Sequence, residues 1–337
     1  MDNFSNVPVL MVFFNRSEPL KKVFEAVKKA RPKKLFLAQD GPRPSNINDV
    51  KNVVACREVV KDIDWDCEVY TDFSDINLGC GKRMSSAISW AFSHVDRLMI
   101  LEDDCVPNQS FFPFCEELLE RYKDDERISM ISGMNHLEKY ENFNKNSYIF
   151  CASGAIWGWA TWKRQWESYD FEMKFINELD VFNKIKKSNF PKYYKKDLIK
   201  QGKNRLKVLN SGKKLSSWTF QYNMIGFLNN QVTIVPMVNM ISNVGLTGDS
   251  THASSSLKMI PKGLQKVFYM KQHEIAFPLN HPTIVYRDDA FDKKVWRLMG
   301  MPIHVAVHRK FSSIIRRIIF GGGKEIKKMF KKVFRKK

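Results

Sequence analysis

Three acidic residues, Glu102, Asp103 and Asp104, stand in a row directly after the apolar segment 97–101. This segment predicts a buried strand, and adjacent carboxylates at the end of a buried strand repel one another and lose hydration. A bound cation removes that cost, and carboxylate oxygens are ligands that Mg²⁺ and Mn²⁺ prefer, often together with phosphates. The local pattern therefore indicates either a divalent-cation site or a solvated turn after the strand.

Polar residues follow three earlier apolar segments in the same way: Asn15 and Arg16 follow 8–14, Asp40 follows 34–38, and Asp72 follows 67–71. Helical segments separate these runs. Strand–helix alternation with short loops predicts an α/β fold with a mostly parallel, doubly wound sheet and helices on both faces. Because ligands bind outside the carboxyl ends of the strands in such sheets, we expect these residues to meet the three acids on one rim, which favours the metal site.

A glycine-containing segment, 77–83, precedes a predicted helix and ends in two basic residues. Gly79 and Gly81 allow the backbone to approach a ligand closely. Lys82 and Arg83 stand at the helix start, where the helix dipole favours anions, so a bound phosphate would explain them. The spacing matches neither the phosphate-binding loop nor the dinucleotide-binding motif, which disfavours P-loop kinases and dinucleotide oxidoreductases.

The segment 157–166 holds four tryptophans: Trp157, Trp159, Trp162 and Trp166. Flat rings stack on sugar faces and on nucleobases, so the cluster indicates a ligand platform, and a core cluster beneath a loop explains it equally well. Both interpretations stay open. In the polar loop 243–252, His252 is a candidate ligand of a metal or a phosphate, although a single loop histidine is more often neither.

The composition, with 44% hydrophobic and 27% charged residues over 337 positions, is that of a soluble globular protein with one large α/β domain or two smaller ones. The net charge is +19, and more than half of the excess lies in 309–337, which has twelve Lys and Arg residues against Glu325. Two basic amphipathic helices are predicted, at 304–320 and 324–337. This pattern favours binding in the plane of an anionic membrane over binding to nucleic acid or a solvated, disordered tail.

No uncharged segment approaches the roughly 20 residues that span a bilayer, so we expect any membrane association to be peripheral. The N-terminal residues do not have the pattern of a signal peptide. The six cysteines are scattered without a C-x-x-C pair, which predicts reduced thiols. Together these features predict a cytoplasmic protein on the inner face of the cell membrane.

The chain from about residue 8 to 285 resembles nucleotide-sugar-dependent glycosyltransferases of the GT-A fold. Within them it is most similar to bacterial family 2-like sugar transferases related to the animal β-1,2-N-acetylglucosaminyltransferase I. The resemblance rests on the segments PVLMVFFNRSEPLKK, LAQDGPR, NLGCGKRMSSAISWAF, LEDDCVPN, WGWATWKRQW, NMISNVGL and DSTH. These segments are specific when taken together, whereas an isolated acidic triplet is not.

The resemblance implies a set of site residues. Glu102-Asp103-Asp104 fill the D-x-D-type position, and Asp104 would bind Mn²⁺ or Mg²⁺ directly. Asn15 and Arg16 would contact the nucleotide, and Asp40 would hydrogen-bond a uracil. Lys82 and Arg83 would contact the diphosphate or the ribose. Trp157, Trp159 and Trp218 fall in the region that binds the donor sugar and the acceptor. The implied donor is a UDP-sugar.

One position departs from the family pattern. Relatives carry an acid directly after the tryptophan that matches Trp218, and in an inverting transferase this region supplies the general base for the acceptor hydroxyl. Here the position holds Thr219, which cannot act as a base at neutral pH. Asp249 is our candidate for the base, and His252 is a candidate metal ligand.

The expected function is metal-dependent transfer of a hexosyl or N-acetylhexosaminyl group from a UDP-sugar to a hydroxyl of a surface glycan, such as capsule or lipopolysaccharide, or of a lipid-linked acceptor. We expect a GT-A domain at 1–290, with a nucleotide-sugar half at about 1–108 and an acceptor half at about 109–290, and a basic membrane-associating tail at 291–337. Thr219 keeps a non-catalytic nucleotide-sugar binder open. A sugar nucleotidyltransferase is less favoured, because no glycine-rich basic loop follows the first strand.

Overall fold

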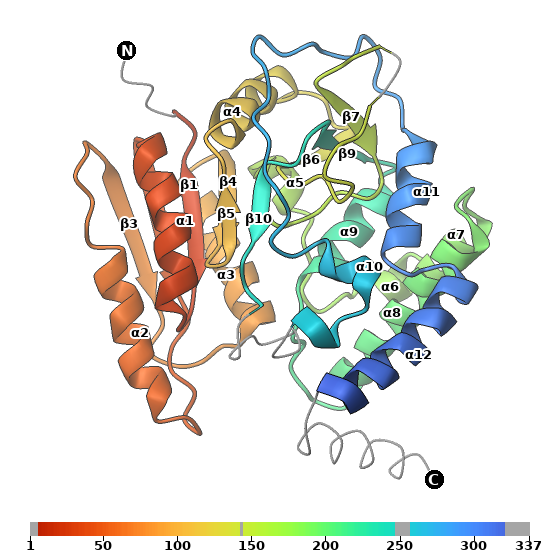
Figure 1. Ribbon diagram of the computed structural model, residues 1–337, viewed down its shortest axis with the longest axis horizontal. Coiled ribbons are helices and arrows are strands. Elements are labelled where there is room, and N and C mark those ends of the chain that lie inside the picture. The colour runs from red at the N-terminus through yellow and green to blue at the C-terminus, as the bar shows by residue number, and fades with distance from the viewer. Residues whose placement is uncertain (1–5, 142–143, 247–256, 321–337) are drawn as a thin grey trace.

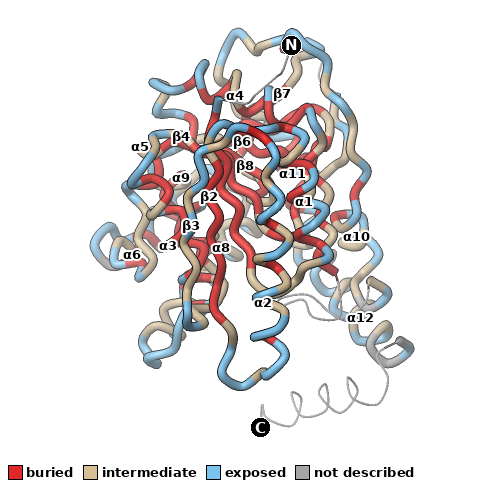
Figure 2. Tube along the Cα trace, turned by 90° about the vertical axis from the view of Figure 1, so that its left-hand side faces the viewer, coloured by how far each residue is buried: buried red, intermediate tan, exposed pale blue. Residues whose placement is uncertain are grey.

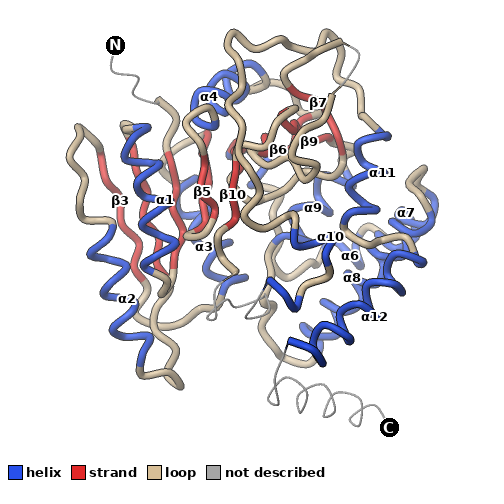
Figure 3. Tube along the Cα trace, viewed as in Figure 1, coloured by secondary structure: helices blue, strands red, loops and turns tan. Residues whose placement is uncertain are grey.

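A large sheet with strand order β3-β2-β1-β4-β8-β6-β9-β7 forms the centre of the computed structural model, which describes residues 6–141, 144–246 and 257–320 (Figures 1 and 3). Its strands are β1 (Val9–Phe13), β2 (Lys34–Gln39), β3 (Glu68–Phe73), β4 (Arg97–Glu102), β6 (Ile128–Ser132), β7 (Tyr148–Cys151), β8 (Trp159–Trp162) and β9 (Val232–Pro236). A separate antiparallel pair joins β5 (Cys105–Pro107) to β10 (Ile241–Asn243).

The helices are α1 (Ser17–Ala30), α2 (Asn48–Val59), α3 (Cys80–Phe92), α4 (Phe111–Arg121), α5 (Lys163–Trp166), α6 (Phe175–Glu178), α7 (Val181–Lys187), α8 (Lys192–Asn210), α9 (Thr219–Leu228), α10 (Lys262–Gln265), α11 (Asp289–Leu298) and α12 (Ile303–Phe320), with a 3₁₀ turn, η1, at Leu257–Met259. None of these described helices is both long enough and apolar enough to cross a membrane.

The N-terminal half of the sheet is parallel, as the alternation of strands and helices predicts. β1 lies between β2 and β4, and β3 extends the sheet beyond β2, all four in the same direction. Successive residues of β1 belong to different cores: Met11 faces the cluster that includes α1 and α4, whereas Leu10 faces the cluster that includes α3. Both faces are therefore covered, which explains the unbroken apolar run of this strand. Figure 2 shows the buried strands enclosed by helices with exposed outer turns.

The C-terminal half of this mostly parallel sheet is mixed. β8 runs antiparallel to both β4 and β6, while β9 is parallel to β6 and antiparallel to β7. The middle of the tryptophan segment, residues 159–162, is thus a central strand that is buried along its whole length. A strand that is paired on both edges and covered on both faces has no free surface, so its residues must be apolar or hydrogen-bonded.

The expected boundary between domain and tail near residue 290 lies too early. Phe291 and Val295 of α11 are fully buried in one cluster with Ile149 of β7 and Val235 of β9. The Asp288 side chain caps this helix by accepting a hydrogen bond from the Phe291 amide at 2.8 Å. Because removal of α11 would expose this cluster, the folded domain extends at least through α11.

Candidate active site

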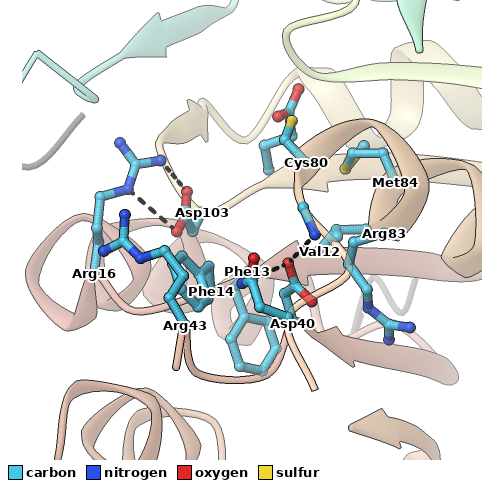
Figure 4. A pocket seen from close by; sticks show the side chains of 13 residues that line it. Val12, Phe13, Phe14, Arg16, Asp40, Arg43, Cys80, Arg83, Met84 and Asp103 are labelled. Atoms are coloured by element: carbon cyan, nitrogen blue, oxygen red, sulfur yellow. Dashed lines mark hydrogen bonds and ion pairs between the residues drawn. The ribbon is translucent and has the colours of Figure 1, made fainter. Parts of the chain in front are cut away.

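A pocket lies where β1, β2 and β4 end and α3 begins, at the carboxyl edge of the parallel half of the sheet (Figure 4). It is lined by Val12, Phe13, Phe14, Arg16, Asp40, Arg43, Asn77, Gly79, Cys80, Arg83, Met84, Glu102 and Asp103. Its volume of about 130 Å³ is smaller than that of a pocket for a whole drug-sized ligand, so it can bury one ring of a larger molecule. Parallel strands bring their carboxyl ends to one edge, which is why five residues predicted from separate segments meet here.

Arg16 supplies the positive charge beside the acidic residues. It is the N-cap residue of α1, and its guanidinium donates to both oxygens of Asp103 and, from Nη2, to Asp104 Oδ2 at 2.8 Å. Figure 4 shows the Arg16 guanidinium joined to the Asp103 carboxylate at one side of the pocket. The side chains are 18% exposed for Arg16 and 6% and 15% exposed for the two aspartates, so this pair is largely shielded from water.

One arginine is not enough to keep three neighbouring carboxyl groups ionised. Burial and the charges of Asp104 and Asp103 raise the pKa of Glu102 to about 8. Burial also raises the pKa of Asp103 to about 6, against the opposing effect of Arg16. Among the described residues, the Glu102 carboxyl group has neither a hydrogen bond nor an ion pair, and Glu102 lines the pocket.

The donor set fits a divalent cation of the Mg²⁺ or Mn²⁺ type. Over the described ranges, no three His, Cys, Asp or Glu side chains are arranged as a complete metal cage. Mg²⁺ does not require one, because it commonly uses one or two carboxylates together with water and substrate phosphates. Glu102 and Asp104 are the residues that would hold it.

Asp40 connects the end of β2 to the segment before α3. Its carboxylate accepts hydrogen bonds from the Leu78 amide at 2.7 Å, the Gly79 amide at 3.0 Å and the Asn77 side chain at 3.1 Å. Burial raises the pKa of Asp40, and these backbone donors oppose that rise. Asp40 therefore fixes the glycine segment at the pocket mouth, and a direct bond from Asp40 to a uracil stays a prediction.

The two basic residues at the start of α3 point to different places. Arg83 is buried, lines the pocket, and donates to the Asp72 carboxylate at 2.8 Å, while its Nε atom is buried without a partner among the described residues. Lys82 is exposed, and its ammonium lies 5.6 Å from the centre of the Phe171 ring, outside the pocket lining. Consecutive helical residues project about 100° apart, so only one of the pair can face the pocket.

Asn15, also predicted to contact the nucleotide, is hydrogen-bonded to helix α2. Its side-chain amide donates to Asp49 Oδ1 of α2 at 2.8 Å, and it does not belong to the pocket lining. Asp49 accepts further bonds from Arg43, which lowers the pKa of Asp49. Asn15 thus helps to fix α2 beside the pocket.

A distant segment completes the acidic cluster. β10 pairs with β5, which brings the Asn243 side chain to Asp104 Oδ1 at 3.2 Å and the Gly245 carbonyl to Arg16 Nη1 at 3.3 Å. A Cβ atom on Gly245 would lie 1.9 Å from Asp104 Oδ2, so only glycine fits there. The sequence shows this segment as a polar loop with glycines and carries no signal of its contact with the acids. The candidate base Asp249 and the candidate ligand His252 lie outside the described residues.

Two of the predicted sugar-contacting tryptophans are core residues, which corrects the platform interpretation for them. Trp159 and Trp218 are 0% and 1% exposed, and their rings stack with centroids 5.6 Å apart. Trp166 and Tyr222 pack around them. Rings enclosed in this way cannot offer a face to a sugar. Trp157 is only partly buried and packs against Phe268, so a ligand role for it stays a prediction.

Comparisons with known proteins leave the family open. No protein-family model matches the sequence. A search of curated proteins finds no match either. Among solved structures, a crystal structure of UDP-glucose pyrophosphorylase complexed with UDP-glucose is similar at a TM-score of 0.31 and 9% identity, over 48% of this chain and 78% of that chain. A likeness of this size carries no conclusion about the activity of this chain.

Proposed function

We propose that this protein is a glycosyltransferase of the GT-A type that uses a nucleoside diphosphate sugar, with UDP as the nucleotide. The observation that carries the proposal is the convergence of Arg16, Arg83 and the acids Glu102 and Asp103 on one pocket at the carboxyl edge of the parallel strands. Ligands of open α/β sheets bind at this edge. Cationic side chains beside a cluster of carboxyl groups suit a ligand that combines anionic phosphates with a divalent cation.

In the proposed reaction, an acceptor hydroxyl attacks the anomeric carbon of the sugar. The bond from that carbon to the β-phosphate oxygen breaks, the diphosphate leaves with the electron pair, and the hydroxyl proton passes to a base. Arg83 and the amino-terminal end of α3 face the pocket and stabilise the departing negative charge. A Mg²⁺ or Mn²⁺ ion held by Glu102 and Asp104 would supply further charge neutralisation.

Thr219 cannot supply the general base of the proposed reaction. The Thr219 hydroxyl lies 3.1 Å from the Ser217 hydroxyl, and neither group is basic at neutral pH. We propose Asp249, the candidate taken from the sequence, as the base, with inversion at the anomeric carbon. The acceptor is proposed to be a surface glycan or a lipid-linked sugar at the inner face of the membrane.

Thermal-shift measurements with UDP-sugars, GDP-sugars and TDP-sugars test the donor site. A ligand at one hundred times its Kd stabilises the native state by about 2.7 kcal/mol, so a UDP-sugar with Mn²⁺ should raise the Tm clearly. Arg83→Ala should lose most of this shift relative to its own ligand-free Tm. Lys82→Ala removes the neighbouring charge outside the pocket and should keep the shift. Equal loss in both variants, or no shift with any donor, would contradict the proposal.

A non-catalytic binder stays a second candidate, because the position expected to hold the base is Thr219. It predicts the same thermal shift with no turnover of the donor. A measurement of donor turnover therefore distinguishes the two candidates, whereas a binding measurement does not.

A further inference from the structure

Helix α12 packs on the domain with Arg309 and Arg316 and exposes a row of apolar side chains. The Arg309 guanidinium lies close against Gly263 and Gly300, and Arg316 donates to the Lys258 carbonyl at 3.0 Å. The opposite side carries an apolar stripe, defined here as Ile303, Val307, Phe311, Ile315 and Ile319, whose side chains are 50–64% exposed. Residues four apart follow one another along one side of a helix, so the stripe is continuous. A helix that only completed a core would be turned the other way.

A basic hollow adjoins the start of this stripe. We define the basic hollow by its charged and titratable lining residues Lys192 and Lys196 of α8, Lys293, Lys294 and Arg297 of α11, and His304 of α12. All six are exposed, and no acidic residue lines the hollow. None of the six forms an ion pair with any described residue, whereas basic residues elsewhere in this chain do so repeatedly. The charge of the hollow is thus available to an external anion.

The basic hollow and the apolar stripe form one surface. Ile303 begins the stripe and lines the hollow, next to His304. In Figure 1, α12 runs along the lower edge of the molecule beside α8 and below α11. A bilayer with anionic lipids matches both the basic hollow and the apolar stripe. Its phosphate headgroups attract basic side chains, and the boundary with the acyl chains accepts apolar ones.

We propose that this surface binds peripherally to an anionic phospholipid bilayer, with headgroups in the basic hollow and the apolar stripe in the headgroup–acyl boundary. A second copy of the chain is a poorer occupant, because a two-fold interface on this face would place two basic hollows close together. Nucleic acid would leave the stripe without a partner. The proposal uses α8, which lies outside the C-terminal region, and it does not depend on the identity of the enzymatic reaction.

Co-sedimentation of the full chain with phosphatidylcholine vesicles, with and without phosphatidylglycerol, tests the proposal. A basic side chain near an anionic surface strengthens binding roughly fivefold. The triple change Lys196→Gln, Lys293→Gln, Arg297→Gln should therefore weaken binding to anionic vesicles roughly 100-fold. The change Val307→Ser, Phe311→Ser, Ile315→Ser should weaken it roughly tenfold or more, because binding scales with buried apolar area.

Matched controls distinguish binding through this surface from binding that depends only on the overall charge of the protein. Lys21→Gln, Lys22→Gln, Lys29→Gln removes the same charge from the exposed side of α1 and should leave binding within about twofold. The exchange Lys196→Arg, Lys293→Arg, Arg297→Lys keeps the charge and should bind as the unchanged protein does. Equal binding with and without phosphatidylglycerol would overturn the proposal, as would unchanged binding of the serine variant. A dimer in solution that the serine variant dissociates would also overturn it, in favour of a second copy.

Discussion

Replacing Arg16 by Ala is expected to lower the free energy of unfolding by about 3 kcal/mol and to make stability depend on divalent cations. Arg16 contacts Asp103 and Asp104, and both aspartates are shielded from water. Removing one partner from a buried ion pair leaves uncompensated charge, which costs about 3–5 kcal/mol. Urea denaturation with EDTA and with Mn²⁺ measures both effects. Mn²⁺ should restore much of the loss, because a divalent cation can replace the guanidinium between the carboxylates.

The control for this prediction is Arg97→Ala. Arg97 pairs with Glu120 at 2.7 Å, but their side chains are 34% and 56% exposed. Exposed pairs contribute about 0–1 kcal/mol, so this variant should change little and should not respond to Mn²⁺. If Arg16→Ala were as stable as the unchanged protein in EDTA, our account of the acidic cluster would be wrong.

Trp218→Ala is expected to destabilise the protein by about 3–5 kcal/mol, the range for removing a buried aromatic side chain. Trp218 is 1% exposed and packs against Trp159, Trp166 and Tyr222. The gap left in this cluster could not be filled by small movements, because the three remaining rings are packed in the same buried core. Urea denaturation measures the loss.

Trp157→Ala provides the comparison, since Trp157 is partly buried and lies 5.4 Å from Phe268 between ring centroids. We expect a loss of about 1 kcal/mol there, as for a typical single substitution. If Trp218 were a ligand platform, its replacement would instead leave stability unchanged and weaken donor or acceptor binding. That result would contradict the core assignment.

The site could be predicted from the sequence where it is built by local rules. Apolar runs followed by polar residues predict parallel strands, and parallel strands bring Arg16, Asp40 and the acids to one edge whatever the details of packing. The contact between Arg16 and the acids could not be predicted in the same way. Its geometry depends on the Arg16 rotamer and on the twist between β1 and β4, which residue types do not determine.

The remaining parts of the site depend on long-range pairing. Asn243 reaches Asp104 across 139 residues through the β5–β10 pair, and no periodic pattern connects two strands of three residues each. For the tryptophan segment, the residue types alone do not distinguish between two structures. Its aromatic residues fit both a platform and a buried strand, and only the pairing of β8 with β4 and β6 decides between them.

The central claim is that the bond between the sugar and the β-phosphate is broken at this pocket. The most direct test is ³¹P NMR of a UDP-sugar that has been incubated with the full chain, Mg²⁺ and membrane lipid acceptors. The account predicts that resonances of UDP replace those of the donor, and that EDTA or Asp104→Ala prevents the change. A donor that binds and stays intact would contradict the claim in favour of a non-catalytic binder. Formation of UTP after addition of pyrophosphate would contradict it in favour of a nucleotidyltransferase.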